Sequence, residues 1–209
     1  MGDSALTDVA TALAGGPTAA NAASMTHRAA RYADLKPLVT QLHAVIDESP
    51  YYNQAFKRFE KQRLGVGYLD ALREADPSHV LILEHDGRMA GAMVSGPEFG
   101  TLFRYWSWIA PQFRHTRLGM YGMRAFEETF GNGRFHKVST YVRPSNEVSL
   151  ALLRRYGYSQ TCLLEKHLFG LDFVLMEKSY TKAVEGYDSG IRLGRVAAAK
   201  RWLKRLARP

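Results

Sequence analysis

The sequence predicts an α/β domain in which a mixed central β-sheet has helices on both sides. Three observations favour this fold class. Segments of strand length alternate along the chain with segments whose apolar residues recur at helical spacing. The chain has 209 residues, of which 46% are hydrophobic, so it is long enough to bury a sizeable core. An Asp86-Gly87 pair between two apolar runs is typical of a β-hairpin turn.

The N-terminal part of this fold is expected to contain one strand and two helical segments. The strand is expected at 26–32, and the helical segments at 35–47 and 56–75. In the first helix, Leu38 and Leu42 are four residues apart and therefore share one face. One side of this helix is apolar as a result.

The remaining elements alternate in the same way. Strands at 80–84 and 89–94 flank the Asp86-Gly87 turn, and another strand is expected at 102–109. Further along are a helix at 118–130, a strand at 137–142, a helix that begins after Asn146, and two strands at 159–168 and 172–179 that are split at Gly170.

Both ends of the chain differ in composition from its middle. Residues 1–25 are rich in Ala, Gly, Thr and Ser and have no basic segment, which predicts a flexible extension and not a signal peptide. The folded domain is expected at 26–181, and a linker with a basic amphipathic helix at 182–209. From Ser189 to the end the chain contains seven basic residues and no acidic one, so only +1 of the net charge of +8 belongs to everything before that point. The seven are Arg192, Arg195, Lys200, Arg201, Lys204, Arg205 and Arg208.

The tail has three interpretations. From about Val196, its apolar residues share one side of a helical wheel and its basic residues the other. This pattern suits an anionic membrane surface or an acidic partner such as acyl carrier protein. Packing of Trp202 on the protein's own domain explains it equally well. Because the charge is confined to the tail and no nucleic-acid-binding motif is present, the sequence argues against nucleic-acid binding.

Residue usage argues against several other kinds of site. Cys162 is the single cysteine, so an internal disulfide is excluded, and we expect a buried structural thiol in a cytoplasmic protein. No apolar run approaches the roughly 20 residues that span a bilayer. The seven histidines are scattered without ligand spacing, so no metal site is expected. A Gly-x-Ser-x-Gly nucleophile motif is absent.

Two motifs carry the functional prediction. In the first, Arg114 and Arg117 immediately precede the helix expected at 118–130. The first amides of a helix have no intrahelical acceptor and favour an anion, and arginine adds forked donors that suit phosphate. The second motif begins at Asn146 and ends at Tyr158. The alternative explanation of the first motif is a solvated turn, and that of the second is a plain helix cap at Asn146.

Together the two motifs resemble those of the GNAT N-acyltransferase superfamily. Its motif A, Arg/Gln-x-x-Gly-x-Gly/Ala, falls on Arg114, Arg117, Leu118 and Gly119. Its motif B, Asn-x-x-Ser/Ala-x-x-Leu-Tyr-x-x-x-Gly-Phe, falls on Asn146, Ser149, Leu152, Leu153, Gly157 and Tyr158. The order of segments from about 26 to 180 also matches the family domain. The resemblance implies a mostly antiparallel sheet in which two splayed parallel strands form the acyl-CoA cleft.

The resemblance also implies which residues bind acetyl-CoA or another acyl-CoA. An amide near Ile109 would polarise the thioester carbonyl, and the motif A loop would hold the pyrophosphate. The implied binding residues are Ile109, Arg114, His115, Thr116, Arg117, Leu118, Gly119, Met120, Asn146 and Ser149. Two departures stand out: Arg117 replaces the first glycine of motif A, and Leu153 replaces the tyrosine that often serves as the general acid.

The catalytic assignments are less constrained by the sequence. Glu98, ahead of the strand at 102–109, is the candidate base, with Glu84 as a second choice. Ser107 is a candidate for ordering a water molecule, and Tyr156 is the candidate acid in place of the missing tyrosine. Each of these residues also has a plain structural explanation. The two glutamates can be solvated carboxylates, Ser107 an ordinary strand serine, and Tyr156 a core aromatic.

We therefore expect an N-acyltransferase (EC 2.3.1.-) that transfers an acetyl group to the amine of a small molecule. One alternative is a longer-chain acyltransferase that uses acyl-CoA or acyl carrier protein at the inner face of a membrane. The other is a non-catalytic protein that binds CoA or docks a partner. Pairing of edge strands in a homodimer is a further expectation, because edge strands of this fold often pair.

Overall fold

The computed structural model describes residues 24–114, 116–188, 190, 191, 199 and 203. His115, most of the predicted N-terminal extension, and the seven basic residues of the tail lie outside the described residues. Of the predicted amphipathic helix from Val196, only Ala199 and Leu203 belong to the described residues.

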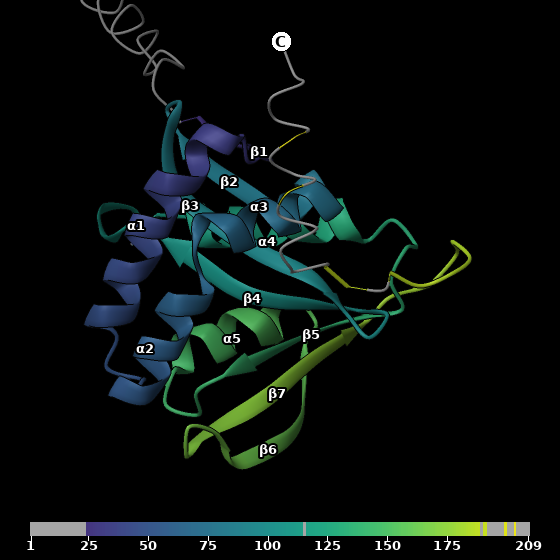
Figure 1. Ribbon diagram of the computed structural model, residues 1–209. Coiled ribbons are helices and arrows are strands. Elements are labelled where there is room, and N and C mark those ends of the chain that lie inside the picture. The colour runs from purple at the N-terminus through teal and green to yellow at the C-terminus, as the bar shows by residue number, and fades with distance from the viewer. Residues whose placement is uncertain (1–23, 115, 189, 192–198, 200–202, 204–209) are drawn as a thin grey trace, which may run out of the picture.

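Strands and helices alternate along the described chain (Figure 1). The strands are β1 (Met25–Ala29), β2 (Val80–His85), β3 (Arg88–Glu98), β4 (Thr101–Ile109), β5 (Lys137–Val142), β6 (Ser159–Leu168) and β7 (Leu171–Ser179). The helices are α1 (Tyr32–Glu48), α2 (Gln54–Arg63), α3 (Val66–Ala75), α4 (Leu118–Phe130) and α5 (Glu147–Arg155). Two short 3₁₀ turns, η1 (Pro77–His79) and η2 (Pro111–Phe113), precede β2 and α4.

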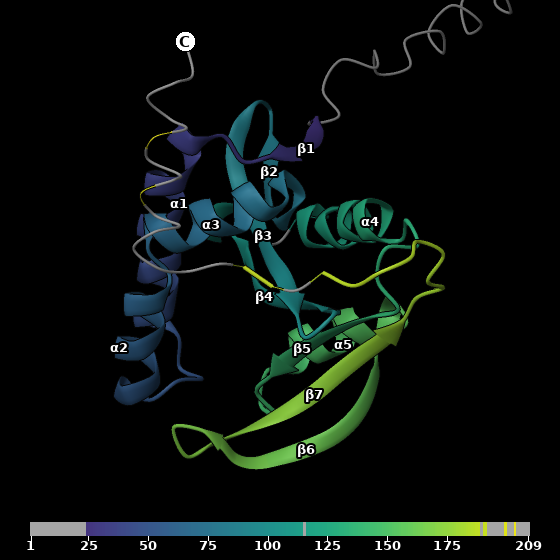
Figure 2. The ribbon, with the colours of Figure 1, turned by 45° about the vertical axis from the view of Figure 1, so that its right-hand side comes forward.

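The seven strands form one sheet in the order β1-β2-β3-β4-β5-β7-β6. Its neighbouring strands are antiparallel except for β4 and β5, which are parallel. The mixed sheet that the sequence predicts is therefore confirmed, including its splayed parallel pair. Because β5 pairs with β7, the hairpin of β6 and β7 extends the sheet beyond this parallel pair (Figure 2).

Helices cover both faces of the sheet, as predicted (Figure 2). On one face, α4 and α5 bury Phe126 and Leu153 in an apolar cluster. On the other, α1 and α3 bury residues such as Leu38 in a second cluster. Strand β2 shows the period-2 alternation behind this arrangement, because Leu81 faces the first cluster and Ile82 the second.

Several predicted bounds differ from the structure. Helix α1 begins at Tyr32 and not at residue 35, and strand β3 ends at Glu98 and not at residue 94. The expected helical segment at 56–75 is two helices, because α2 ends at Arg63 and Gly65 caps α3. The first strand ends at Ala29 and not at residue 32, because the Asp34 carboxylate accepts the Arg31 amide at 2.6 Å and starts a helix there. Such side-chain caps compete locally with strand extension.

A β-bulge interrupts the pairing of β3 with β4. Val94 pairs with Trp106 and Ser95 with Arg104, which leaves Tyr105 without a partner. A bulge redirects the side chains that follow it. Here Tyr105 and Trp106 both pack with the cluster under α1 and α3, while Arg104 contacts α4 on the opposite face. Trp106 and Trp108 share one face, as residues two apart on a strand do.

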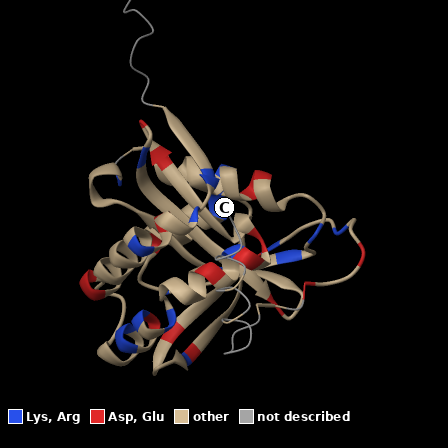
Figure 3. Cartoon of the chain, turned by 45° about the horizontal axis from the view of Figure 1, so that its top comes forward, with Lys and Arg blue, Asp and Glu red and all other residues tan. Residues whose placement is uncertain are grey.

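Charged residues are interspersed over the described chain (Figure 3). Several of them form ion pairs between elements, for example Arg28 with Glu84 at 2.8 Å and Lys178 with Glu127 at 2.5 Å. This distribution agrees with the small net charge expected of the chain ahead of the tail.

Candidate active site

The parallel strands β4 and β5 separate soon after they meet. Their pairing consists of Leu102 with Val138 and Phe103 with Ser139. One residue further on, the Thr140 hydroxyl donates to the backbone oxygen of Arg104 at 2.8 Å, and this side-chain bond spans the widening gap. Beyond this point one edge of β4 has no partner among the strands of the described chain, so alternate backbone amides along that edge face the gap.

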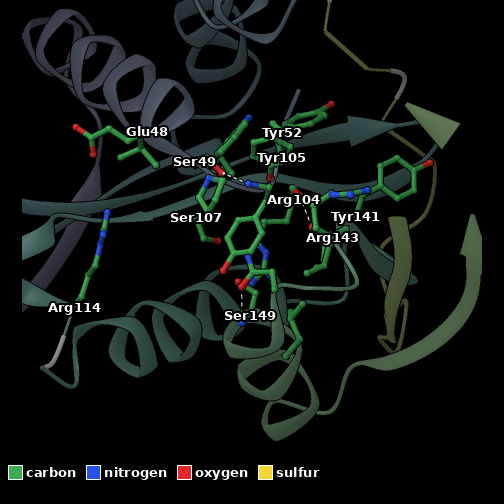
Figure 4. A pocket seen from close by; sticks show the side chains of 18 residues that line it. Glu48, Ser49, Tyr52, Arg104, Tyr105, Ser107, Arg114, Tyr141, Arg143 and Ser149 are labelled. Atoms are coloured by element: carbon green, nitrogen blue, oxygen red, sulfur yellow. Dashed lines mark hydrogen bonds between the residues drawn. The ribbon is translucent and has the colours of Figure 1, made fainter. Parts of the chain in front are cut away.

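The gap opens into a cavity of about 440 Å³, which we call the inter-strand cavity (Figure 4). Its walls come from β4, β5, the start of α5 and the connection between α1 and α2. The strand residues that line it are 104–107 of β4 and 140–142 of β5, followed by Arg143. From the other elements come Val45, Glu48, Ser49, Pro50, Tyr51, Tyr52, Arg114, Asn146, Ser149 and Leu153.

A second cavity of about 730 Å³, the helix-side cavity, lies along α4, α5 and the second half of β4. It is mostly apolar and includes Met93, Trp108, Met123 and Leu152. Five residues line both cavities: Arg104, Ser107, Arg114, Ser149 and Leu153. The two cavities are therefore adjacent, and these five residues mark where they meet.

The structure brings most of the predicted binding residues to these cavities. Ile109, Arg114, Thr116, Gly119, Met120 and Ser149 line the helix-side cavity, and Asn146 lines the inter-strand cavity. Arg117 lines a neighbouring depression that shares Met120 and Arg155 with the helix-side cavity. Leu118 is fully buried and belongs to the core.

The turn before α4 has the features of an anion site. Arg117 is the N-terminal cap residue of α4, and the Thr116 hydroxyl accepts the Leu118 amide at 3.2 Å. A Cβ placed on Gly119 would meet no atom within 4 Å, so this first turn is open to a ligand. Helix dipole, free amides and the Arg114 side chain all favour negative charge there.

Helix α5 begins as the sequence predicts. The Asn146 side chain accepts the Ser149 amide at 3.2 Å and caps the helix. Leu153 is 1% exposed and lines both cavities, so the position of the missing motif B tyrosine faces the site with an apolar side chain.

The three predicted catalytic residues are not brought together. Ser107 lines both cavities, whereas Glu98 and Tyr156 line neither. Glu98 ends β3 and pairs with Thr101 at the turn into β4. The Tyr156 hydroxyl donates to the backbone oxygen of Met120 at 2.7 Å, in the depression that Arg117 also lines. Glu84, the second choice of base, pairs with Arg28 at the β1 edge of the sheet.

A buried carboxylate on α2 supports the cleft wall and was not anticipated from the sequence. Glu60 is 4% exposed, accepts the Trp106 indole N–H at 2.5 Å and pairs with Arg63. Arg63 also donates to the Tyr68 hydroxyl at 2.7 Å. The amino-acid pattern of α2 gives no indication of this network, because Glu60 lies in a run of charged residues that looks solvent-exposed.

Four tyrosine side chains line the inter-strand cavity, whereas the motif B tyrosine is missing. They are Tyr51, Tyr52, Tyr105 and Tyr141. Burial raises the pKa of Tyr52 to about 12 and raises the pKa values of Tyr105 and Tyr141 as well. These phenols are therefore protonated donors at neutral pH.

Cys162 is exposed on β6, which corrects the expectation of a buried thiol, and it does not line either cavity. Strand β6 is the sheet edge, so its side chains lack the cover that central strands have. Within the described ranges, no group of three or more His, Cys, Asp or Glu side chains is placed to hold a metal ion. None of the helices in that same part of the chain is long and apolar enough to cross a membrane.

Comparison with known families gives a match that covers more than half of the chain. The family model described as "Acetyltransferase (GNAT) family" matches residues 41–158. No curated protein is similar enough in sequence to match.

Solved structures share the fold at low sequence identity. The structure of yncA from Salmonella typhimurium with its cofactor acetyl-CoA has a TM-score of 0.62 at 16% identity, and the match covers 78% of this chain and 98% of that one. The PaiA N-acetyltransferase from Thermoplasma acidophilum in complex with coenzyme A has a TM-score of 0.62 at 16% identity, with coverage of 75% and 99%. The ribosomal-protein-alanine N-acetyltransferase from Brucella melitensis has a TM-score of 0.59 at 21% identity, with coverage of 74% and 99%.

Proposed function

The chain belongs to the acetyltransferase (GNAT) family, and from this premise we propose that it transfers an acyl group from acyl-CoA directly to the amine of a small molecule. One observation carries the proposal. The gap between β4 and β5 opens into two adjacent cavities that meet at Arg104, Ser107 and Leu153, which gives donor and acceptor separate places beside one reaction point.

The donor is assigned to the helix-side cavity. Its apolar lining suits the pantetheine arm, and the turn before α4 suits the pyrophosphate through its first amides, Arg114 and Arg117. The unpaired edge of β4, which ends at Ile109, supplies backbone amides toward the thioester carbonyl. Fixed donors of this kind stabilise the charge that develops on that oxygen.

The acceptor is assigned to the inter-strand cavity. The amine nitrogen attacks the thioester carbon, the carbon–sulfur bond breaks, and the leaving thiolate takes up a proton. Direct attack is favoured because Cys162 lies outside both cavities and so cannot carry a covalent intermediate at this point.

Proton transfer is assigned as follows. Ser107 orders a water molecule that receives the amine proton. Glu98 lines neither cavity, so the proton reaches its carboxylate through solvent. Tyr156 was the sequence candidate for the acid, but Tyr52 and Tyr141 line the acceptor cavity and are the better-placed hydroxyl donors. A protonated phenol delivers its proton to the thiolate as that group departs.

Calorimetric titration of the full chain with acetyl-CoA, octanoyl-CoA and free CoA tests the donor site. We expect acetyl-CoA affinity to fall by about 10- to 150-fold in Arg114→Ala, because one charge-assisted contact contributes about 1.5–3 kcal/mol. Arg58→Ala is the matched control, since Arg58 is exposed on α2 away from both cavities. Failure to bind or consume any acyl-CoA would overturn the proposal.

The same titration separates the two alternatives. Tighter binding of octanoyl-CoA would favour a longer-chain acyltransferase, for which the size and apolar lining of the helix-side cavity are the supporting observation. Tight binding without turnover over a broad panel of amines would favour a non-catalytic CoA-binding protein.

A further inference from the structure

Arg104 is a buried cation that no carboxylate of the described residues neutralises. It is 6% exposed, its Nη1 donates to the Met123 sulfur at 2.6 Å, and its guanidinium lies 5.7 Å and 5.4 Å from the ring centres of Phe126 and Tyr158. A thioether is a weak acceptor, and ring faces only partly replace hydration. Burying a charge without a counter-ion is costly.

Other partly buried arginines of this protein have carboxylate partners. Four arginines with side chains 13 to 29% exposed pair with carboxylates in the described chain. These pairs are Arg28 with Asp34, Arg63 with Glu60, Arg73 with Asp70, and Arg134 with Asp76. Arg104 therefore departs from the pattern that this fold follows elsewhere.

Arg143 is a second exception, and it lines the same cavity. Its Nη1 donates to the backbone oxygen of Asp172, and its guanidinium lies 5.3 Å from the Phe173 ring centre. Its Nε is buried and has no hydrogen-bond partner among the described residues. Both arginines line the inter-strand cavity, Arg104 from β4 and Arg143 from the end of β5 (Figure 4).

The described lining of this cavity carries a clear excess of positive charge. Arg104, Arg114 and Arg143 oppose a single acidic residue, Glu48, which is exposed at the end of α1. A lining of this charge, with hydroxyl groups from Ser49 and several tyrosines, attracts an anionic ligand.

We propose that the inter-strand cavity binds a substrate carboxylate, with Arg104 as its principal partner and Arg143 as a second. The guanidinium fork matches the two oxygens of a carboxylate. Because Arg104 also lines the helix-side cavity, the carboxylate belongs close to the reacting atoms. It is carried either by an acceptor of the amino-acid type or by a transferred acyl group that ends in a carboxylate.

This inference rests on the proposed function for the reaction but has its own test. Initial rates of the full-length chain are measured in two arms. The first compares α-amino acids with their amides at fixed acetyl-CoA, and the second compares succinyl-CoA with butyryl-CoA at a fixed amine. A preference for the charged substrate in the first arm assigns the carboxylate to the acceptor, and one in the second arm assigns it to the donor.

Arg104→Met is the decisive variant. We expect the ratio of kcat/KM for the carboxylate substrate to kcat/KM for its uncharged analogue to fall by about 10- to 100-fold in this variant. Its unliganded form should have a Tm equal to or above that of the parent, because an unpaired buried charge has been removed. A merely structural arginine would lower Tm and affect both substrates alike.

Arg28→Met is the matched control, because Arg28 pairs with carboxylates at the β1 edge and lines neither cavity. It should keep the full preference. If Arg104→Met does not fold, Arg143→Met is used in its place and should reduce the preference. The proposal is overturned if neither arm shows a preference in the parent, or if the preference survives in the variant.

If the protein shows no turnover, the proposed function is refuted but the inference about the carboxylate site is not. In that event, calorimetry still tests the carboxylate site by comparing succinyl-CoA with butyryl-CoA and each amino acid with its amide. Equal affinity for the members of every pair would then overturn the inference.

Discussion

Gly119 and Gly122 lie three residues apart on α4 but have opposite surroundings. A Cβ at Gly119 would meet no atom within 4 Å, whereas a Cβ at Gly122 would lie 2.6 Å from Cδ1 of Leu83. Gly119→Val should therefore keep the fold and weaken acetyl-CoA binding about tenfold or more, because the added methyl groups occupy the donor's space at an overpacking cost of about 1–3 kcal/mol. Titration calorimetry and a thermal melt measure the two effects.

The comparison with Gly122→Ala makes this test specific. That variant should lose about 1–3 kcal/mol of stability, because the contact with the Leu83 side chain lies inside the packed core. Unchanged acetyl-CoA affinity in Gly119→Val would show that the donor does not pass the first turn of α4.

At this scale more of the predicted binding residues than of the predicted catalytic residues line the two cavities. Arg114, Asn146 and Ser149 follow a local pattern of helix starts, which depends on neighbours in the chain. The roles of Glu60 and Arg104 depend on partners far away, such as Trp106 and Met123. No local pattern reveals such long-range pairing, so these residues emerged only from the folded structure.

Among elements, the junction of β4 and β5 is held by few interactions. Thr140→Val keeps the shape of the side chain but removes the bond to the backbone oxygen of Arg104. We expect a loss of about 1 kcal/mol in the free energy of unfolding, because an acceptor loses its partner. The KM for the acceptor should rise more than the KM for acyl-CoA, because Thr140 lines the inter-strand cavity and not the helix-side cavity.

Denaturant unfolding and steady-state kinetics check this prediction. Ser139→Ala is a suitable control, because Ser139 bonds Glu177 on β7 and lines neither cavity. An equal rise of both KM values would contradict the assignment of the inter-strand cavity to the acceptor.

The boundaries of an element are predictable where the apolar periodicity of the sequence is clear. Helix α4 and strand β5 have the predicted bounds, because each has clear apolar periodicity between evident breakers. The bulge at Tyr105 was not predictable. The bulge allows two consecutive aromatic residues, Tyr105 and Trp106, to pack on the same face of the sheet. Period-2 reasoning alone would have placed them on opposite faces.

For the whole molecule, His79 makes stability depend on pH. The side chain is fully buried, stacks on Phe130 at a ring separation of 5.5 Å and bonds Ser95, while its Nε2 has no partner. Burial lowers its pKa from 6.5 to about 4. Between these values the unfolded chain binds the additional proton, so stability falls as the pH falls from about 6.5 to about 4, by roughly 2–3 kcal/mol.

Urea titrations between pH 4 and pH 7 measure this effect. The His79→Gln variant should have a flatter profile in that window. The lowered pKa values of Asp34, Asp76 and Glu177 contribute separately, because their stabilisation is complete above their unfolded values and is lost only at lower pH. A parent profile that is flat from pH 6.5 to 4.5 would contradict the role assigned to His79.

The sequence sufficed to predict the architecture of the whole domain because alternation of strands and helices is a repeated, local property. The position of the sheet's parallel junction came from the family resemblance, since no periodicity distinguishes a parallel neighbour from an antiparallel one. The surface role of the tail stays a prediction, because its basic residues lie outside the described residues.

The two register pairs between β4 and β5 also have a consequence for folding. They close a connection of about 36 residues, the separation of Arg104 and Thr140, whereas β2, β3 and β4 form a meander of neighbours and β6 and β7 form a hairpin. Local pairings close small loops and form early, so the β4–β5 junction should be among the last parts of the sheet to assemble. A ligand that contacts both strands would then act as a cross-link, and native-state hydrogen exchange at the junction should slow most when one is bound.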